Sequence, residues 1–148
     1  MAFPTTIRSP NATYEVQFGH LQRPTHSNTS WEKAQFEVHA QKWADLSEYN
    51  YGVSILNDCK YGYSAEGNVI TLSLLRAPKA PDADCDMGDH QFVYSILPHV
   101  GAVQSSGVIQ EGYNLNAPLQ IRTSLPATQE LSLFTVDQPN IIIESVKK

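Results

Sequence analysis

The chain has 148 residues, of which 41% are hydrophobic and 17% charged, a composition typical of one folded domain rather than of a disordered segment. Ten Lys and Arg residues against fifteen Asp and Glu residues give a net charge of −5, and no basic cluster is present, which excludes the usual kind of nucleic-acid-binding surface. The longest apolar runs, such as Ile141 to Ile143, are only a few residues long, so no membrane-spanning segment is predicted.

Apolar residues recur at every second position along much of the chain, which is the period of a half-buried β-strand. In the first such segment Tyr14, Val16 and Phe18 fall on one face. The predicted strands cover residues 13–21, 35–40, 51–56, 68–75, 91–97, 119–122, 131–136 and 140–146. Residues 72–75 are apolar on both faces, which favours a central strand. Short strands separated by turn residues predict an all-β fold, an antiparallel β-sandwich of about eight strands with little helix.

Helical signals are confined to two short segments. Residues 105–115 have room for one or two helical turns, and Thr29 with Glu32 forms the pattern of a capping box. Residues 77–89 combine prolines with a series of aspartates and form the longest predicted loop. A connection of this length is unusual in a compact domain, which favours a structured or partner-facing loop.

The domain is predicted to occupy residues 14–148, with residues 1–13 as an N-terminal lead-in. The first residues lack the basic start and apolar core of a secretory signal, which favours a cytoplasmic protein. Cys59 and Cys85 are the only cysteines and form no CxxC pair. We therefore expect both to be reduced packing residues rather than a disulfide.

The sequence contains no complete catalytic set. The five histidines form no HxxxH or HExxH pair, and no GxSxG motif or phosphate-binding glycine loop is present. Asp86, Asp89 and His90 are candidate ligands for a divalent cation, but their spacing is more typical of turn capping at the start of a strand. We therefore predict no metal site and no catalytic residue in this chain.

One loop concentrates groups of the kind that bind sugars. Asn57, Asp58, Lys60, Tyr61 and Tyr63 follow a strand that ends in an apolar pair, and they combine amide, carboxylate, ammonium and aromatic side chains. Aromatic faces stack on sugar rings while planar polar groups bind the hydroxyls. The alternative is a hairpin whose tyrosines pack in the core and whose charges point to water.

Trp31 and Trp43 carry the same ambiguity. An exposed tryptophan is a platform on which a sugar ring stacks, whereas a buried one is an ordinary part of the core of a β-sandwich. The spacing of these residues does not distinguish the two roles.

Several stretches, in this order, resemble the C-terminal β region of glycoside hydrolase family 38 α-mannosidases, most closely the cytosolic and fungal vacuolar branch. They are Arg23 to Trp31, Lys42 to Tyr63, Leu72 to Asp82, Asp86 to His90, and Pro98 with His99. The resemblance covers residues 14–120 and is less distinct beyond them.

The resemblance implies the C-terminal domain of a zinc-dependent retaining exo-α-mannosidase that removes terminal α-mannosyl residues from oligomannosides and free glycans. The zinc ligands and the nucleophile of that family are absent from this chain, so the isolated chain is expected to be inactive. The implied partners are the N-terminal catalytic domain of the same enzyme, which holds the zinc, the α-mannoside substrate and further copies in a homo-oligomer. The implied location is the cytoplasm, or a vacuole or lysosome-like compartment.

The resemblance further implies that the loop from Asn57 to Tyr63 lines the substrate cleft, with Lys60 at the position of a basic residue that contacts substrate hydroxyls. His26, Asn28 and Arg76 are weaker candidates, since they are equally suited to an interdomain seam. Two alternatives remain. An exposed Trp31 or Trp43 would favour an autonomous mannoside-binding module, and an exposed apolar patch would favour a structural or oligomerisation domain.

Overall fold

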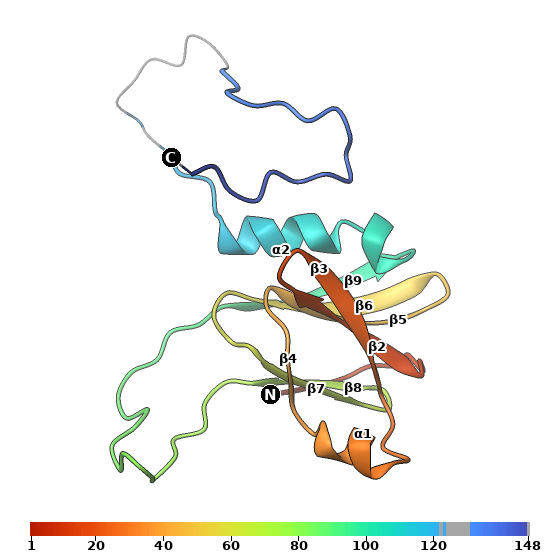
Figure 1. Cartoon of the computed structure of the whole chain (residues 1–148), viewed down its shortest axis with the longest axis vertical. Coiled ribbons are helices and arrows are strands. Elements are labelled where there is room, and N and C mark those ends of the chain that lie inside the picture. The colour runs from red at the N-terminus through yellow and green to blue at the C-terminus, as the bar shows by residue number, and fades with distance from the viewer. Residues whose placement is uncertain (122, 124–130, 148) are drawn as a thin grey trace.

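The computed structural model describes residues 1–121, 123 and 131–147, and these residues form nine strands in two antiparallel sheets (Figure 1). The smaller sheet has the order β1 (Ala2–Pro4), β8 (Val69–Ser73), β7 (Gly62–Glu66) and β4 (Val38–His39). The larger sheet has the order β3 (Gly19–Pro24), β2 (Asn11–Val16), β5 (Trp43–Glu48), β6 (Tyr51–Asn57) and β9 (Tyr94–Val100). The predicted all-β sandwich is confirmed.

The core lies between the two sheets and is filled by one face of each. Tyr14, Leu46 and Ile55 come from the larger sheet, and Ile70 and Leu72 come from the smaller one. All five side chains are at most 1% exposed. Period-two alternation places such residues on one face of each strand, and their removal from water is the main favourable term in folding. Strand β8 lies between β1 and β7, so residues 72 and 73 have the expected inner position, whereas residues 74 and 75 follow the end of the strand.

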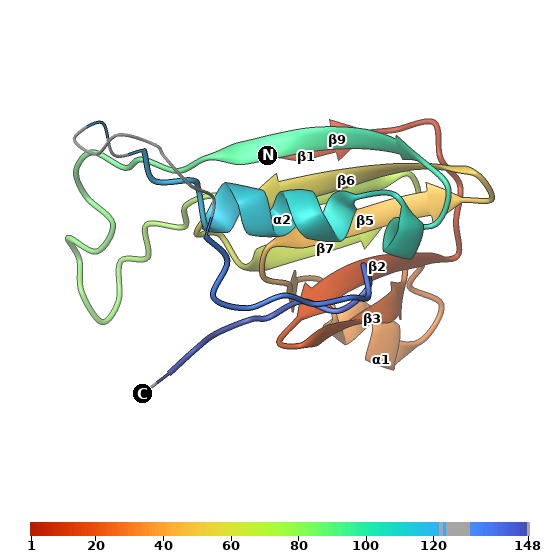
Figure 2. The same ribbon diagram turned by 90° about the horizontal axis from the view of Figure 1, so that it is seen from above.

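Two helices and one 3-10 turn complete the described structure. Helix α1 (Ser30–Ala34) begins at Thr29, whose side chain accepts a hydrogen bond from the Glu32 backbone N–H, and the Glu32 carboxylate accepts one in return from the Thr29 N–H. The predicted capping box is thus confirmed. The turn η1 (Val103–Ser105) leads into helix α2 (Val108–Asn116), which confirms helix in the segment 105–115. Helix α2 covers the outer face of the larger sheet, where Trp43 and Leu56 pack against Val108 (Figure 2).

The single strand predicted for residues 13–21 is wrong, because the segment is a hairpin. Strands β2 and β3 pair from Val16 opposite Gly19 onward, and Gln17 and Phe18 form the turn. Phe18 has a positive φ of 61° and is 87% exposed, so it is not on the buried face with Tyr14. Strict alternation continues through a two-residue turn, and for that reason the pattern does not show the reversal.

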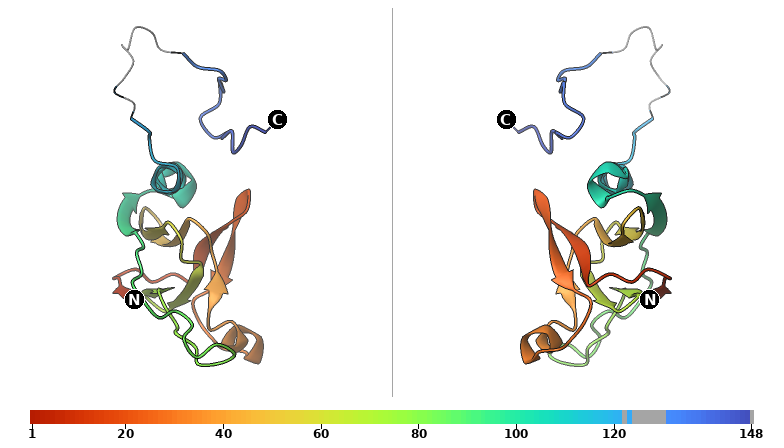
Figure 3. Two further views of the ribbon diagram at one scale, coloured as in Figure 1. Left: turned by 90° about the vertical axis from the view of Figure 1, so that its left-hand side faces the viewer. Right: turned by 90° about the vertical axis from the view of Figure 1, so that its right-hand side faces the viewer.

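The late strands predicted for residues 119–122, 131–136 and 140–146 are also wrong, since none of their described residues belongs to a strand. Arg122 lies outside the described residues. The described part of this tail runs along the far side of α2 from the sandwich (Figures 1 and 3). Within this tail, the Glu144 carboxylate accepts a hydrogen bond from the Tyr113 hydroxyl of α2 and lies 3.8 Å from Lys42 Nζ. Alternation alone does not make a strand, because a strand also needs a partner edge.

Strands β5 and β7 were missing from the sequence prediction, and residues 35–40 contribute only the two-residue strand β4. The expected lead-in, residues 1–13, is part of the fold. Strand β1 pairs with β8, Phe3 and Ile7 are in the core, and the amino group of Met1 donates to Leu72 O at 2.8 Å.

Both cysteines are free, as predicted, but Cys59 is exposed rather than packed. No helix among the described residues is long and apolar enough to cross a membrane.

Candidate functional site

The predicted loop begins with a buried asparagine that organises it. Asn57, at the end of β6, is 1% exposed, and its amide donates to Gln41 O at 2.8 Å and to the Tyr63 hydroxyl at 2.5 Å. Its side-chain oxygen accepts from the Lys60 backbone N–H. Tyr63 is fully buried, and burial raises the pKa of its hydroxyl. These two side chains have their polar atoms satisfied inside the domain, so they shape the loop and have no surface with which to contact a ligand.

Hydrogen bonds of Asp58 connect this loop to Val93, the residue just before β9. Its carboxylate accepts from the Val93 N–H at 3.0 Å, and its own N–H donates to Val93 O at 3.1 Å. A hydrogen bond from the Cys59 thiol, followed by the one from Val93, lowers the pKa of the Asp58 carboxyl. The carboxylate thus has partners within the domain and acts as a clamp between β6 and β9.

Two of the candidate residues in the loop keep access to solvent, since Tyr61 is exposed and Lys60 is half-buried. Tyr61 is 55% exposed, and the Lys60 ammonium lies 5.0 Å from the centre of the Phe92 ring. Among the described residues Lys60 makes no ion pair. An ammonium that rests on an aromatic face keeps its donors available, because the ring attracts the charge without accepting all of its hydrogen bonds.

Strand pairing brings Lys60 together with residues far away in the sequence. Gly62 pairs with His39 on one side and with Ser73 on the other, so the end of β4, the start of β7 and the end of β8 meet at one end of the smaller sheet. The space between them and the long loop is a cleft of about 280 Å³. We call it the β7–β8 cleft, and its lining residues are Glu37, Lys60, Gly62, Ser73, Leu74, Leu75, Arg76, Asp86 and His90.

The polar groups of the β7–β8 cleft are fixed in place by contacts among themselves. Arg76 forms an ion pair with Glu37, and a side chain at Gly62 would collide with the Glu37 carboxylate. Asp86 accepts from the Ala77 N–H at 3.2 Å, and its carbonyl oxygen lies 2.9 Å from His90 Nε2. The cleft thus presents donors and acceptors of both charges in a shallow hollow, which suits a neutral polyhydroxylated ligand better than an anion. Of the sequence candidates it contains Lys60 and Arg76.

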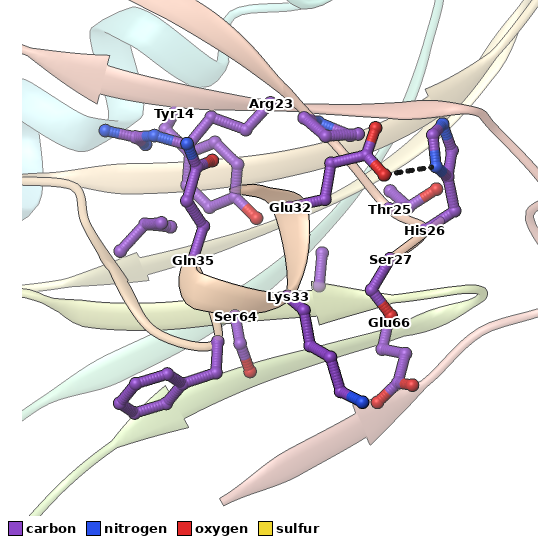
Figure 4. A pocket seen from close by; sticks show the side chains of 14 residues that line it. Tyr14, Arg23, Thr25, His26, Ser27, Glu32, Lys33, Gln35, Ser64 and Glu66 are labelled. Atoms are coloured by element: carbon purple, nitrogen blue, oxygen red, sulfur yellow. Dashed lines mark ion pairs between the residues drawn. The ribbon is translucent and has the colours of Figure 1, made fainter. Parts of the chain in front are cut away.

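The other weaker candidates, His26 and Asn28, lie next to a different cavity. His26 Nδ1 is 3.5 Å from a Glu32 carboxylate oxygen (Figure 4), and the Asn28 N–H donates to the same oxygen at 2.7 Å. This second cavity measures about 270 Å³ and shares no residue with the β7–β8 cleft. We call it the α1 pocket, and its lining residues are Tyr14, Arg23, Pro24, Thr25, His26, Ser27, Glu32, Lys33, Gln35, Phe36, Val38, Ser64, Ala65 and Glu66.

The two tryptophans differ in environment. Trp43 is 1% exposed and belongs to the packing under α2, whereas Trp31 on α1 is 83% exposed. No group of three or more His, Cys, Asp or Glu residues among those described is arranged to hold a metal ion. The zinc implied by the resemblance therefore finds no ligand set in the described part of this chain.

Sequence reasoning did not select Glu37, Tyr14 or Arg23, although all three line cavities. It considered Asp86 and His90 only as metal ligands. Glu37 and Tyr14 each occupy an ordinary position in an alternating strand pattern, and nothing local marks them. For Arg23, a basic residue directly before Pro24 at the end of a strand was a weak signal of an edge position.

The comparison with known families decides what kind of domain this is. The family model described as "Glycosyl hydrolases family 38 C-terminal domain" matches residues 1–84. The chain belongs to this family. The matched segment includes β1 to β8, the loop from Asn57 to Tyr63 and Arg76. The resemblance drawn from the sequence motifs is therefore confirmed.

Individual relatives agree with the family. The chain is 56% identical over 151 aligned residues to "Alpha-mannosidase 2C1" of Mus musculus and 47% identical over 147 to "Alpha-mannosidase" of Saccharomyces cerevisiae, and each alignment covers 99% of the chain. It spans only 14% of the length of either relative. The crystal structure of an alpha-mannosidase from Enterococcus faecalis V583 superposes on 76% of the chain and 14% of its own, with a TM-score of 0.65 at 22% identity, which shows a shared fold.

Proposed function

We propose that this chain is the C-terminal domain of a zinc-dependent retaining exo-α-mannosidase, which releases terminal α-mannosyl residues from oligomannosides and free glycans. The support is its membership of the family 38 C-terminal domains and its identity with α-mannosidases along nearly the whole chain. In this proposal the zinc, the nucleophile and the acid/base are supplied by the catalytic domain of the whole enzyme. The isolated chain should therefore be inactive.

The position of Lys60 in the β7–β8 cleft is the observation that supports a role for this domain in substrate binding. Lys60 has no ion-pair partner among the described residues, and it stands beside the fixed Arg76–Glu37 pair. In the whole enzyme this cleft would form one wall of the substrate channel. Lys60 would then donate to hydroxyls of sugar units that do not react, which holds the substrate in position and reduces the entropic part of the barrier.

The test is the Lys60→Ala variant of the full-length enzyme, with Lys79→Ala as the matched control. Lys79 carries the same charge and lies in the long loop beside the cleft, but it does not line the cleft. A hydrogen bond from a charged donor contributes about 1.5–3 kcal/mol, so kcat/KM for an oligomannoside should fall by roughly tenfold to a hundredfold. The loss for a simple aryl α-mannoside should be smaller, because that substrate has no second sugar for Lys60 to contact.

Two results would contradict this role. If Lys60→Ala and Lys79→Ala leave kcat/KM equally unchanged, the cleft does not contact substrate. If Lys60→Ala lowers the thermal midpoint of the enzyme along with its activity, the residue supports the fold. The proposal requires a kinetic loss with an unchanged midpoint.

A structural or oligomerisation role is a second candidate, favoured by the edge of the larger sheet. Strand β9 is the outer strand of this sheet. Ile96 and Val100 on the strand are 52% and 71% exposed, and Val93 just before it is 53% exposed. An uncovered apolar edge of this kind is expected where another domain or a second copy of the enzyme packs. Hydrogen exchange at β9 that is fast in the isolated chain and slow in the full enzyme would support this role, and equal exchange would contradict it.

We also propose a cytoplasmic location, with a vacuole or lysosome-like compartment as the alternative. The free thiols of Cys59 and Cys85 fit a reducing compartment. Fractionation of cells that express the full-length enzyme distinguishes the two.

A further inference from the structure

The α1 pocket lies at the open side of the sandwich. Strand β3 is the outer strand of the larger sheet and β4 is the outer strand of the smaller one, and helix α1 bridges the gap between them. Figure 4 shows side chains from all these elements converging on one hollow. Its volume of about 270 Å³ is just below the range of pockets for drug-sized ligands, so it suits a ligand of one ring.

Tyr14 is the reason to regard this hollow as a binding site. The residue is 1% exposed, and its hydroxyl is directed into the pocket (Figure 4). Among the described residues no hydrogen-bond partner reaches that hydroxyl, although Arg23 lies over the ring at 4.8 Å. Among the described residues His99 Nδ1 is the fully enclosed side-chain polar atom without a partner, so the Tyr14 hydroxyl opens onto the pocket and can both donate and accept there. A hydroxyl held in this way at the wall of a polar pocket is a group with which the hydroxyls of a ligand can pair.

The walls of the α1 pocket indicate what class of ligand this is. One guanidinium nitrogen of Arg23 donates to His39 O at 3.0 Å, which fixes the side chain and leaves other N–H groups free. Gln35 and Ser64 add groups that both donate and accept. Glu32 and Glu66 offset the positive charges of Arg23 and Lys33, so the lining has no excess positive charge to attract an anion such as phosphate.

The mouth of the α1 pocket adds an aromatic surface. Phe36 lines the pocket and is 76% exposed. Balanced donors and acceptors together with an exposed ring fit a ligand that has hydroxyls on its rim and C–H groups on its face.

We propose that the α1 pocket binds one neutral hexopyranose ring, with the Tyr14 hydroxyl and the Arg23 guanidinium hydrogen-bonded to its hydroxyl groups. The pocket is a sugar site separate from the β7–β8 cleft. The choice of mannose among the hexoses rests on the proposed function of the parent enzyme, whereas the binding of a hexose rests on the pocket alone. In the parent enzyme such a site would hold a branch of the glycan remote from the bond that is cleaved.

The experiment is an amide-resolved NMR titration of the 148-residue chain with methyl α-D-mannopyranoside. A ligand of about a dozen heavy atoms at roughly 0.3 kcal/mol each gives a Kd on the order of 1 mM. Saturable shifts should centre on Gln35, Ser64 and the strand around Tyr14. Tyr14→Phe should weaken binding about tenfold without lowering the thermal midpoint, because it removes only a hydroxyl that has no partner in the protein.

The matched control is Tyr49→Phe, which removes a hydroxyl from a fully exposed tyrosine and should leave Kd unchanged. Shifts centred on residues 57–63 instead would overturn this inference while supporting the role of the β7–β8 cleft. Equal Kd values for the parent chain and Tyr14→Phe would also overturn it, as would saturable binding of inorganic phosphate at the same residues. If a glucoside or galactoside binds and the mannoside does not, the hexose site is supported and only the mannose assignment falls. The kinetic test of Lys60 is independent of every one of these results.

Discussion

His99 Nε2 lies 2.7 Å from an Asp45 carboxylate oxygen on the α2-facing side of the larger sheet, where both side chains are nearly inaccessible to water. The same carboxylate accepts hydrogen bonds from Ser54, at 2.6 Å, and from Ser47. Antiparallel pairing explains the contact, since Asp45 is opposite Ser54 on β6 and β6 lies next to β9. His99 Nδ1 has no partner among the described residues, so the ring proton belongs on Nε2, facing the carboxylate.

Replacing Asp45 with Ala should destabilise the domain strongly. The substitution leaves His99 and Ser54 as buried donors, and Ser47 as a half-buried one, without their acceptor, and each buried donor left unpaired costs about 1–3 kcal/mol. Urea unfolding of the isolated chain measures the loss. Asp84→Ala, which removes an exposed carboxylate from the long loop, should change the unfolding free energy by less than about 0.5 kcal/mol. Equal stability of the two variants would show that the Asp45 network contributes little.

Gly52→Ala should disrupt the same network by a steric route. A Cβ at this position would collide with the His99 ring and with the Ser47 hydroxyl. The ring is buried and is held by its hydrogen bond to Asp45, so overpacking should cost about 1–3 kcal/mol in unfolding free energy. Gly19→Ala is the control, because a Cβ there meets nothing within 4 Å. Thermal midpoints of both variants check the prediction, and a tolerated Gly52→Ala would mean that His99 moves easily.

Cys59 should react more slowly than other exposed thiols. The hydrogen bond to Asp58, then burial and the Asp58 charge, raise the pKa of the Cys59 thiol, and a raised pKa leaves less thiolate at any given pH. In a Cys85→Ser background, Asp58→Asn should move the pH–rate profile for iodoacetamide to lower pH and speed alkylation at neutral pH by roughly threefold to tenfold. An unchanged profile would show that Asp58 does not control the thiol. Mass spectrometry of the alkylated chain gives the rate.

The sequence by itself determined the class of fold and the family. Period-two alternation predicted β6 and β8 because each of these strands buries one face, or both, against neighbours, and it also predicted β9, in which only His99 is buried. The capping box at Thr29 could also be predicted from the sequence, since its two hydrogen bonds join residues only three positions apart. The family motifs extend across the same strands and identified the chain without any knowledge of its contacts.

The tertiary structure alone decided which residues form the cavities and which strands exist. Glu37 and Arg76 are 39 positions apart, and they meet only because β7 pairs with β4 on one side and with β8 on the other. The same pairing buried Tyr63 and left Lys60 at the surface, although the two are three residues apart. Residues 140–146 show the converse case. Their apolar residues alternate as in a strand, but the segment pairs with no other strand and therefore forms none. The physical reason is that alternation is a local property, whereas hydrogen-bond pairing and cavity geometry depend on contacts between distant segments.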